Sequence, residues 1–570
     1  MIARHPLRWL FALQAALLAV AAARNLQQLN PDAIAYLRIA GYYAGGQMEL
    51  AVTGYWGPLL SWLMVPLLKA DAAPLVAGRV VMVVSGVVFL AGAVSVFRAF
   101  RLPRVALLTG ACIAAAWSVF WSVRHITPDL LLAGLVALAV SATVKLFLCC
   151  SRRGAEAGCF NSEFRIRLLT SAATAGGWWG LAYLAKAVAL PLALLTTAGL
   201  AVFAMSGRRE LRAKLAVRLG LVWLGIALVG GPWIAVLSLH YGQFTFSTTG
   251  PIAHALAGPG EQAAAHPAMT TLHQPDAGRV TQWEEPSRMK YRHWSPLASG
   301  ENFRHQLAVV GGNLGVCWDW LNPWRGWLNG AELPAWRRWL GTFDLLGIGG
   351  LALLLAGCCV VRNWQRLRRQ RWGWALVPVL ALGGLYLPFF VMAEDNRYFY
   401  PALPFLWVLA VGAWGGWARG RVGFGVVNLA FGLAALAWLA AALVGIPNQA
   451  SREAHVLAAQ LRAEDVAGPF AGSAPLPGGR TGLYTAFLLG GRWLGDAPQA
   501  GPGEFVQSGA QVVFVRRGTP ALAELTADRG WREWNAVTES GSLVGEPVTG
   551  RVLLPEAVGV NTRVFVRTSR

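Results

Sequence analysis

The chain has 570 residues, of which 55% are hydrophobic and only 14% are charged, and its mean hydropathy is +0.46. This composition excludes a water-soluble globular protein, since runs of about 20 apolar residues, long enough to cross a bilayer, recur along the chain. The formal net charge of +21 does not indicate nucleic-acid binding, because the basic residues lie between apolar runs, as in the cytoplasmic loops of membrane proteins.

The apolar runs predict a polytopic α-helical membrane protein with about eleven transmembrane helices, because backbone groups in lipid must pair within their own segment. The spans are expected at about residues 7–23, 74–97, 105–122, 129–149, 168–185, 188–205, 219–238, 342–361, 373–392, 398–416 and 422–445. The first run is short enough for a signal peptide, but with so many spans after it we interpret it as a retained helix. A cytoplasmic N-terminus then places every basic cluster inside and the C-terminus outside.

Two long outer loops and a polar tail complete the predicted organisation. Residues 1–446 are expected to form the membrane domain, with outer loops at 24–71 and 240–341. Residues 447–570 are expected to form a small extracytoplasmic α/β domain. Its predicted elements are a helix over 451–464, a strand over 511–515, a helix over 520–529 and a strand over 562–566.

The first outer loop contains a clear helix start. Asn30 is a favoured N-cap, Pro31 suits the first helical position, and the Gly45-Gly46 pair ends the helix. Asp32 then lies in the first turn, with Tyr36 one turn later on the same face, and a second short helix is expected to begin at Pro58. Taken alone, Asp32 is as compatible with helix capping as with catalysis.

Ionisable residues gather on the predicted outer side of the membrane. They are Asp32, His125, Asp129, Lys186, Glu394, Asp395 and Arg397. Ionisable groups near membrane depth are costly and therefore suggest a functional site, here one for an anionic substrate. A patch of structural ion pairs would give the same pattern.

Four segments add a more specific signal. They are Tyr55-Trp56-Gly57-Pro58-Leu59, Arg124-His125-Ile126-Thr127-Pro128-Asp129-Leu130, Gly180-Leu181-Ala182-Tyr183-Leu184-Ala185-Lys186 and Arg397-Tyr398-Phe399-Tyr400-Pro401-Ala402-Leu403-Pro404. Their order and common side, after an early Asp32, resemble the GT-C membrane glycosyltransferases, in the branch with protein O-mannosyltransferases and lipid A aminoarabinose transferases. The resemblance covers about residues 1–445. The sequence differs from the branch at Lys186-Ala187-Val188, where Lys-Gly-Pro is usual.

The resemblance implies a GT-C-like fold and transfer of a sugar from a polyprenyl-phosphate carrier to an acceptor hydroxyl outside a bacterial-type inner membrane. Asp32 would be the general base of an inverting reaction, and Asp129 a second catalytic carboxylate. Lys186 and Arg397 would bind the lipid phosphate, with Tyr36, Tyr55 and His125 as further substrate-binding residues. The acceptor could be a glycolipid, a glycan or a protein. Membrane lipid is the other expected partner.

Other chemistries are less well supported by the residues. The seven cysteines and the irregularly spaced histidines have no metal-ligand pattern, so neither a metal nor another cofactor is expected. A transporter or flippase would favour charges near mid-membrane and repeated halves, whereas these charges lie at one face. A polymerase or ligase of lipid-linked saccharides remains an alternative, because such an enzyme would use cations and histidines in a large outer loop.

Overall fold

The structure is a computed structural model. The residues that it describes are 5–152, 162–205, 212–259, 271–272, 279–321, 372–388, 396–414, 432, 435–436, 438–446, 448–473, 480–497, 499–516, 519–534, 542–543, 558–559 and 562–568. The predicted span at 342–361, the acidic pair Glu394 and Asp395, and more than half of the predicted span at 422–445 lie outside these residues.

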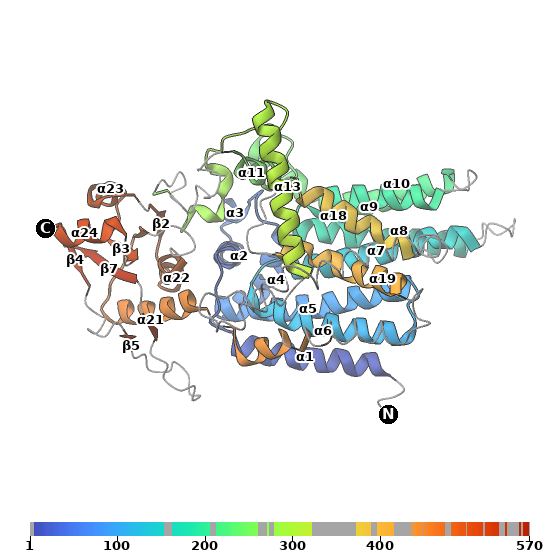
Figure 1. The fold of residues 1–570 in the computed structure, drawn as a ribbon, viewed down its shortest axis with the longest axis horizontal. Coiled ribbons are helices and arrows are strands. Elements are labelled where there is room, and N and C mark those ends of the chain that lie inside the picture. Colours follow the sequence, from blue (N-terminus) through green and yellow to red (C-terminus); the bar gives the residue numbers. More distant parts are fainter. Residues whose placement is uncertain are drawn as a thin grey trace.

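A bundle of long apolar helices forms one half of the molecule (Figure 1). Its helices are α1 (Pro6–Arg24), α5 (Pro74–Ala99), α6 (Arg104–Arg124), α7 (Asp129–Arg152), α8 (Ser162–Ala185), α9 (Ala189–Met205) and α10 (Arg212–Tyr241). Within the described residues, five helices are long and apolar enough to cross a membrane, namely α1, α5, α6, most of α7 and most of α10. The chain is therefore a multi-pass membrane protein, as predicted.

Helix packing in the bundle depends on small residues. A Cβ on Gly92 of α5 would lie 2.5 Å from the carbonyl oxygen of Gly134 in α7, so only glycine allows this approach. Without a hydrophobic driving force in lipid, such close backbone contact is a main source of helix association. The α5–α7 pair thus fixes the position of the first turn of α7, where Asp129 lies.

Short helices lie at one end of the bundle, between it and a small β-sheet (Figure 1). They are α2 (Pro31–Ala44), α3 (Met48–Ala51) and α4 (Pro58–Lys69), so the predicted helix starts at Pro31 and Pro58 are confirmed. Asn30 has the extended backbone of an N-cap, but its Oδ1 accepts the N–H of Ile126 at 3.0 Å instead of an N–H of its own helix. The Asn30 side chain therefore ties α2 to the turn before α7.

The described residues of the long loop predicted at 240–341 contain helical elements of their own. They are α11 (Thr249–Leu256), the 3₁₀ turns η4 (Gln282–Glu284) and η5 (Pro286–Arg288), and α13 (Gly300–Leu321). In Figure 1, α13 crosses the bundle helices nearly at right angles. Farther along the chain are η6 (Trp372–Ala375), α18 (Leu376–Tyr386), η7 (Asn396–Ala402) and α19 (Leu403–Trp414), which correspond to the predicted spans at 373–392 and 398–416.

The C-terminal segment forms a mixed five-stranded sheet with strand order β2-β1-β3-β7-β4. Its strands are β1 (Phe470–Gly472), β2 (Trp493–Asp496), β3 (Val512–Arg516), β4 (Trp531–Glu533) and β7 (Thr562–Arg567), and a separate pair is β5 (Ser542–Leu543) with β6 (Val558–Gly559). The helices beside the sheet are α21 (Gln449–Ala463), α22 (Arg480–Leu488), α23 (Pro502–Gln507) and α24 (Pro520–Ala527). The predicted helices and strands of this segment are thus present, with shifts of one or two residues at most of their ends.

Polar contacts join the C-terminal segment to the turn between α1 and α2. The Ser451 hydroxyl accepts the N–H of Leu29 at 3.0 Å, and the Asn448 side chain donates to the Leu29 carbonyl at 3.1 Å. One continuous core contains both Ala33 of α2 and Tyr484 of α22. The sheet therefore packs on the same side of the bundle as α2, while the boundary at residue 447 stays a prediction.

Candidate functional site

The first feature of the site is an ion pair between residues 365 positions apart in the chain, Asp32 and Arg397. Asp32 lies in the first turn of α2 and Arg397 in η7. Arg397 Nη2 is 2.6 Å from Asp32 Oδ2, and the two side chains are 14% and 15% exposed. Solvent can therefore still reach both groups, which a substrate-binding pair requires.

A second ion pair, whose carboxylate is more buried, continues this arrangement. Asp129 is the first residue of α7, and Lys186 follows directly after α8. Lys186 Nζ lies 2.6 Å from Asp129 Oδ1, while Arg397 Nε lies 3.7 Å from Asp129 Oδ2. The structure thus brings together all four residues that the sequence selected as catalytic carboxylates and phosphate-binding cations.

The two carboxylates differ in their surroundings. The Asp129 side chain is 3% exposed and faces both cations, whereas that of Asp32 is 15% exposed and pairs with Arg397. An enclosed carboxylate between two cations is suited to holding them in place. Asp32 is the carboxylate that a hydroxyl group of a substrate can approach more readily.

Tyr398 is a member of the site that was not singled out from the sequence. Lys186 Nζ lies 4.4 Å from the centroid of its ring, and Arg397 Cζ lies 5.4 Å from it. An aromatic face attracts cations, so the ring helps to hold both of them. The available signal was its place beside Arg397 in the Arg-Tyr segment.

Tyr36 and Tyr55 lie close to the carboxylates. Burial raises the pKa of the Tyr36 hydroxyl well above its usual value, and the charges of Asp129 and Asp32 raise it further. Burial also raises the pKa of Tyr55, with Asp32 as the next cause. Both hydroxyls therefore stay protonated at neutral pH and are available as hydrogen-bond donors near Asp32.

Tyr43, on the same helical face as Asp32, packs instead against Trp62 of α4, with ring centroids 6.2 Å apart. His125 is half-buried just after α6, beside the backbone N–H of Ile126 that binds Asn30. It is thus near the start of α2, and its role in substrate binding stays a prediction.

Gly57 allows the segment 55–59 to lie close to the segment 180–186. It is the residue before α4, and a Cβ added to it would lie 2.2 Å from the carbonyl oxygen of Ala185. Because that atom belongs to the backbone next to Lys186, the loop with Tyr55 and Trp56 can approach the lysine only if residue 57 has no side chain.

Aromatic packing links this loop to the long loop predicted at 240–341. The Trp56 ring contacts Tyr36, Tyr55 and Trp283, with centroid separations of 5.1, 4.7 and 5.1 Å. Trp56 Nε1 also donates to the Trp283 carbonyl at 2.9 Å. Trp283 was not predictable as a neighbour of the site, because it lies in a polar loop without helical or strand periodicity.

Comparison with known proteins gives a match of fold but not of sequence. No known protein family and no curated protein matches the sequence. The structure is similar to that of ArnT from Cupriavidus metallidurans bound to undecaprenyl phosphate, with a TM-score of 0.55, 13% identity, and coverage of 99% of this chain and 98% of that chain. The chain therefore has the ArnT fold, and the GT-C-like fold expected from the motifs is confirmed.

Two further solved structures match with lower scores. One is the oligosaccharyltransferase of Archaeoglobus fulgidus in its apo form, with a TM-score of 0.49, 12% identity, and coverage of 89% of this chain and 69% of that chain. The other is the mycobacterial arabinofuranosyltransferase AftD, with a TM-score of 0.41, 16% identity, and coverage of 99% and 40%.

Proposed function

We propose that this protein is a glycosyltransferase that moves a sugar from a polyprenyl-phosphate carrier to an acceptor hydroxyl, with inversion at the anomeric carbon. The single observation that carries the proposal is the cluster of Asp32, Arg397, Asp129 and Lys186, in a fold shared with a protein that binds undecaprenyl phosphate. The reaction takes place on the outer side of a bacterial-type inner membrane. Eleven spans, an inner N-terminus and an outer C-terminal domain complete the proposed topology.

The proposed reaction requires a base and a stabilised leaving group. The acceptor oxygen attacks the anomeric carbon and gives its proton to Asp32, while the bond from that carbon to the phosphate oxygen breaks. The bond electrons stay on the carrier phosphate, which gains negative charge. Arg397 and Lys186 stabilise that charge, and Asp129 holds the two cations in position.

The charge balance of the cluster suggests how donor binding prepares the base. Two carboxylates and two cations make it formally neutral before a phosphate arrives. A phosphate that binds Arg397 competes with Asp32 for the same guanidinium, which can form paired hydrogen bonds with either group. The donor therefore releases Asp32 from its ion pair at the step in which Asp32 must accept a proton.

The aromatic residues have supporting roles in this proposal. Tyr36 and Tyr55, whose hydroxyls stay protonated, donate hydrogen bonds to the donor near Asp32, and His125 contacts the acceptor or the sugar. The Tyr398 ring keeps Lys186 and Arg397 beside each other despite their like charges.

The proposal is tested with the full chain reconstituted in lipid nanodiscs. Binding of undecaprenyl phosphate is measured first, and release of undecaprenyl phosphate from a panel of undecaprenyl-phosphate sugars is then followed by mass spectrometry, with a membrane extract as the acceptor source. We expect the wild-type chain to bind the carrier and to consume one donor, and Asp32→Asn to bind without consuming it. A wild-type chain that does not bind undecaprenyl phosphate would falsify the proposal.

A further inference from the structure

A short segment of the long outer loop connects the C-terminal sheet to the helix that carries Asp32. We call this segment, residues 279–288, the strap. On one side, the Trp493 N–H of edge strand β2 donates to the Val280 carbonyl at 2.9 Å. On the other side, the strap contacts α2 through η4. The strap is thus held between two parts of the chain that are distant in sequence.

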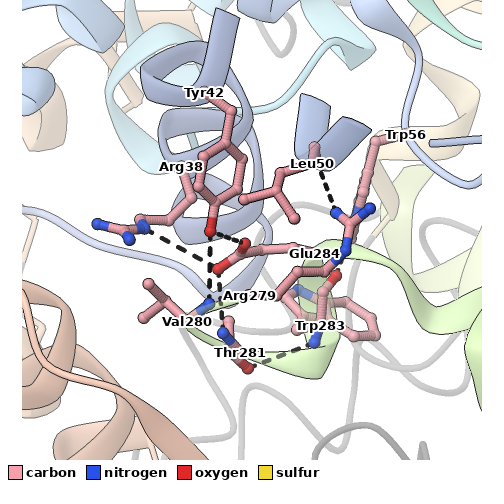
Figure 2. A network of polar contacts seen from close by, with 9 residues as sticks. All are labelled: Arg38, Tyr42, Leu50, Trp56, Arg279, Val280, Thr281, Trp283 and Glu284. Carbon is pink, nitrogen blue, oxygen red and sulfur yellow. Dashed lines mark hydrogen bonds and ion pairs between the residues drawn. The ribbon is translucent and has the colours of Figure 1, made fainter. Parts of the chain in front are cut away.

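The contact with α2 centres on a fully buried carboxyl group, that of Glu284 (Figure 2). Its Oε2 accepts the Tyr42 hydroxyl at 2.7 Å, and its Oε1 accepts the Thr281 N–H at 3.1 Å. Arg38 Nε lies 4.0 Å from Oε1. A buried carboxyl is costly unless such partners satisfy it, so these contacts hold Glu284 to α2.

The neighbouring residues of the strap contact the wall of the proposed site. Trp283 packs on Trp56 and Tyr55, with ring centroids 5.1 and 5.8 Å away, and its carbonyl accepts the Trp56 indole N–H. Arg279, which is 2% exposed, donates to the carbonyl of Leu50 in α3 at 2.8 Å. Figure 2 shows Arg279 and Trp283 on the opposite side of Glu284 from Arg38.

We infer that Glu284 is a positioning residue for carrier binding: it anchors the strap to α2 and thereby holds Trp283 against Tyr55 and Trp56 beside Asp32. This inference rests on the proposed function, in which Tyr55 contacts the donor. It gives the long outer loop and the C-terminal sheet a common task. The sheet and α2 hold the strap, and the strap holds one wall of the site.

The test measures the affinity of the full chain for undecaprenyl phosphate in nanodiscs. Glu284→Ala removes both hydrogen bonds, and we expect affinity to fall about tenfold or more. Glu284→Gln should bind within about threefold of wild type, because an amide can accept from Thr281 and donate to the Tyr42 oxygen. Tyr42→Phe, which removes one bond and keeps the ring, should lie between the two and serves if Glu284→Ala does not fold.

Glu453 provides a matched control, since it is also a buried glutamate that accepts one hydroxyl and one backbone N–H. Its side chain accepts Thr481 Oγ1 at 3.2 Å and the Thr562 N–H at 3.0 Å, between α21, α22 and β7. Glu453→Ala should lower Tm as Glu284→Ala does, but leave carrier affinity within about twofold of wild type.

The outcomes separate the two proposals. If wild type binds the carrier and Glu284→Ala and Tyr42→Phe bind as Glu453→Ala does, Glu284 has only a structural role and the inference is overturned. If Glu284→Gln loses affinity as Glu284→Ala does, hydrogen bonding by residue 284 is not what positions the strap, and the inference is again wrong. If wild type itself does not bind, the proposed function fails first and the inference with it.

Discussion

Arg397 Nη2 lies 2.6 Å from Asp32 Oδ2, and the same guanidinium has its Nε 3.7 Å from Asp129 Oδ2. One cation therefore joins the more exposed carboxylate to the enclosed one. In the proposed reaction the carrier phosphate needs this guanidinium too, which makes Asp32 and the phosphate competitors for one partner.

This competition predicts opposite effects of two substitutions on carrier binding. Arg397→Ala should weaken the binding of undecaprenyl phosphate by roughly 10- to 100-fold, the range for a lost charge-assisted hydrogen bond. Asp32→Asn should bind the carrier at least as tightly as wild type, because an amide releases the guanidinium to the phosphate. Titration of both variants in nanodiscs measures this, and weaker binding by Asp32→Asn would show that Asp32 supports rather than competes with the phosphate.

The pair of the buried Asp129 and the partly exposed Lys186 predicts an order of stabilities. Asp129→Asn leaves two cations without their shared partner and should lower the free energy of unfolding by about 3–5 kcal/mol. Lys186→Met should cost less, because Arg397 still faces Asp129. The double variant should lose less than the sum of the two, since neither charge of the pair is then left alone.

Denaturant unfolding of the four proteins in detergent micelles measures this cycle. Additive losses would mean that the 2.6 Å contact contributes no coupling energy. Equal losses in the two single variants would mean that Arg397 does not compensate for the missing lysine.

The sequence was sufficient to predict the elements whose residues carry a local pattern. Among the described residues, apolar runs predicted the long helices, and the Asn30-Pro31 pair predicted the start of α2. The partner of the Asn30 side chain was not predictable, because the Ile126 N–H is 96 residues away and no local rule favours it over the helix N–H groups.

The residues of the candidate site could be selected from the sequence, but the ion pairs between them could not. The predicted topology places Asp32, Asp129, Lys186 and Arg397 on one side of the membrane, whereas the sharing of Arg397 between two carboxylates depends on how η7 meets α2 and α7. Glu284 was not predictable from the sequence for a different reason. It lies in a 3₁₀ turn of a polar loop, where periodicity is absent, and its Tyr42 contact spans 242 residues.

Close approach at Gly57 gives a third prediction. Gly57→Ala places a methyl group against the Ala185 carbonyl, so the backbone must move and we expect a loss of about 1–3 kcal/mol in stability. Carrier affinity should fall as well, because Tyr55 and Lys186 are then held farther apart. Thermal unfolding and carrier titration measure the two effects.

Gly41 is the matched control for this substitution. It lies in the interior of α2 with nothing within 4 Å of an added Cβ, so Gly41→Ala should stabilise the chain by about 0.5–1 kcal/mol. If Gly57→Ala were as stable as Gly41→Ala, the close contact between the loop and α8 would not exist in solution.

A fourth prediction concerns pH and the buried Glu284. Burial raises the pKa of this carboxyl, and the hydrogen bond from Tyr42 and the charge of Arg38 offset only part of that effect. The folded chain therefore keeps the Glu284 proton to a higher pH than the unfolded chain. Below the usual range of glutamate both states are protonated, so the difference in stability between wild type and Glu284→Gln should not change with pH there.

As pH rises through that range, the unfolded wild-type chain ionises first and its folded state loses stability relative to Glu284→Gln, until the folded carboxyl ionises as well. Tyr42→Phe should extend this loss to higher pH, because it removes a hydrogen bond that favours the ionised form. Tm measured from about pH 4 to pH 8 for the three proteins gives the comparison. A Tm difference between wild type and Glu284→Gln that stays constant over this range would mean that Glu284 has the same pKa in both states.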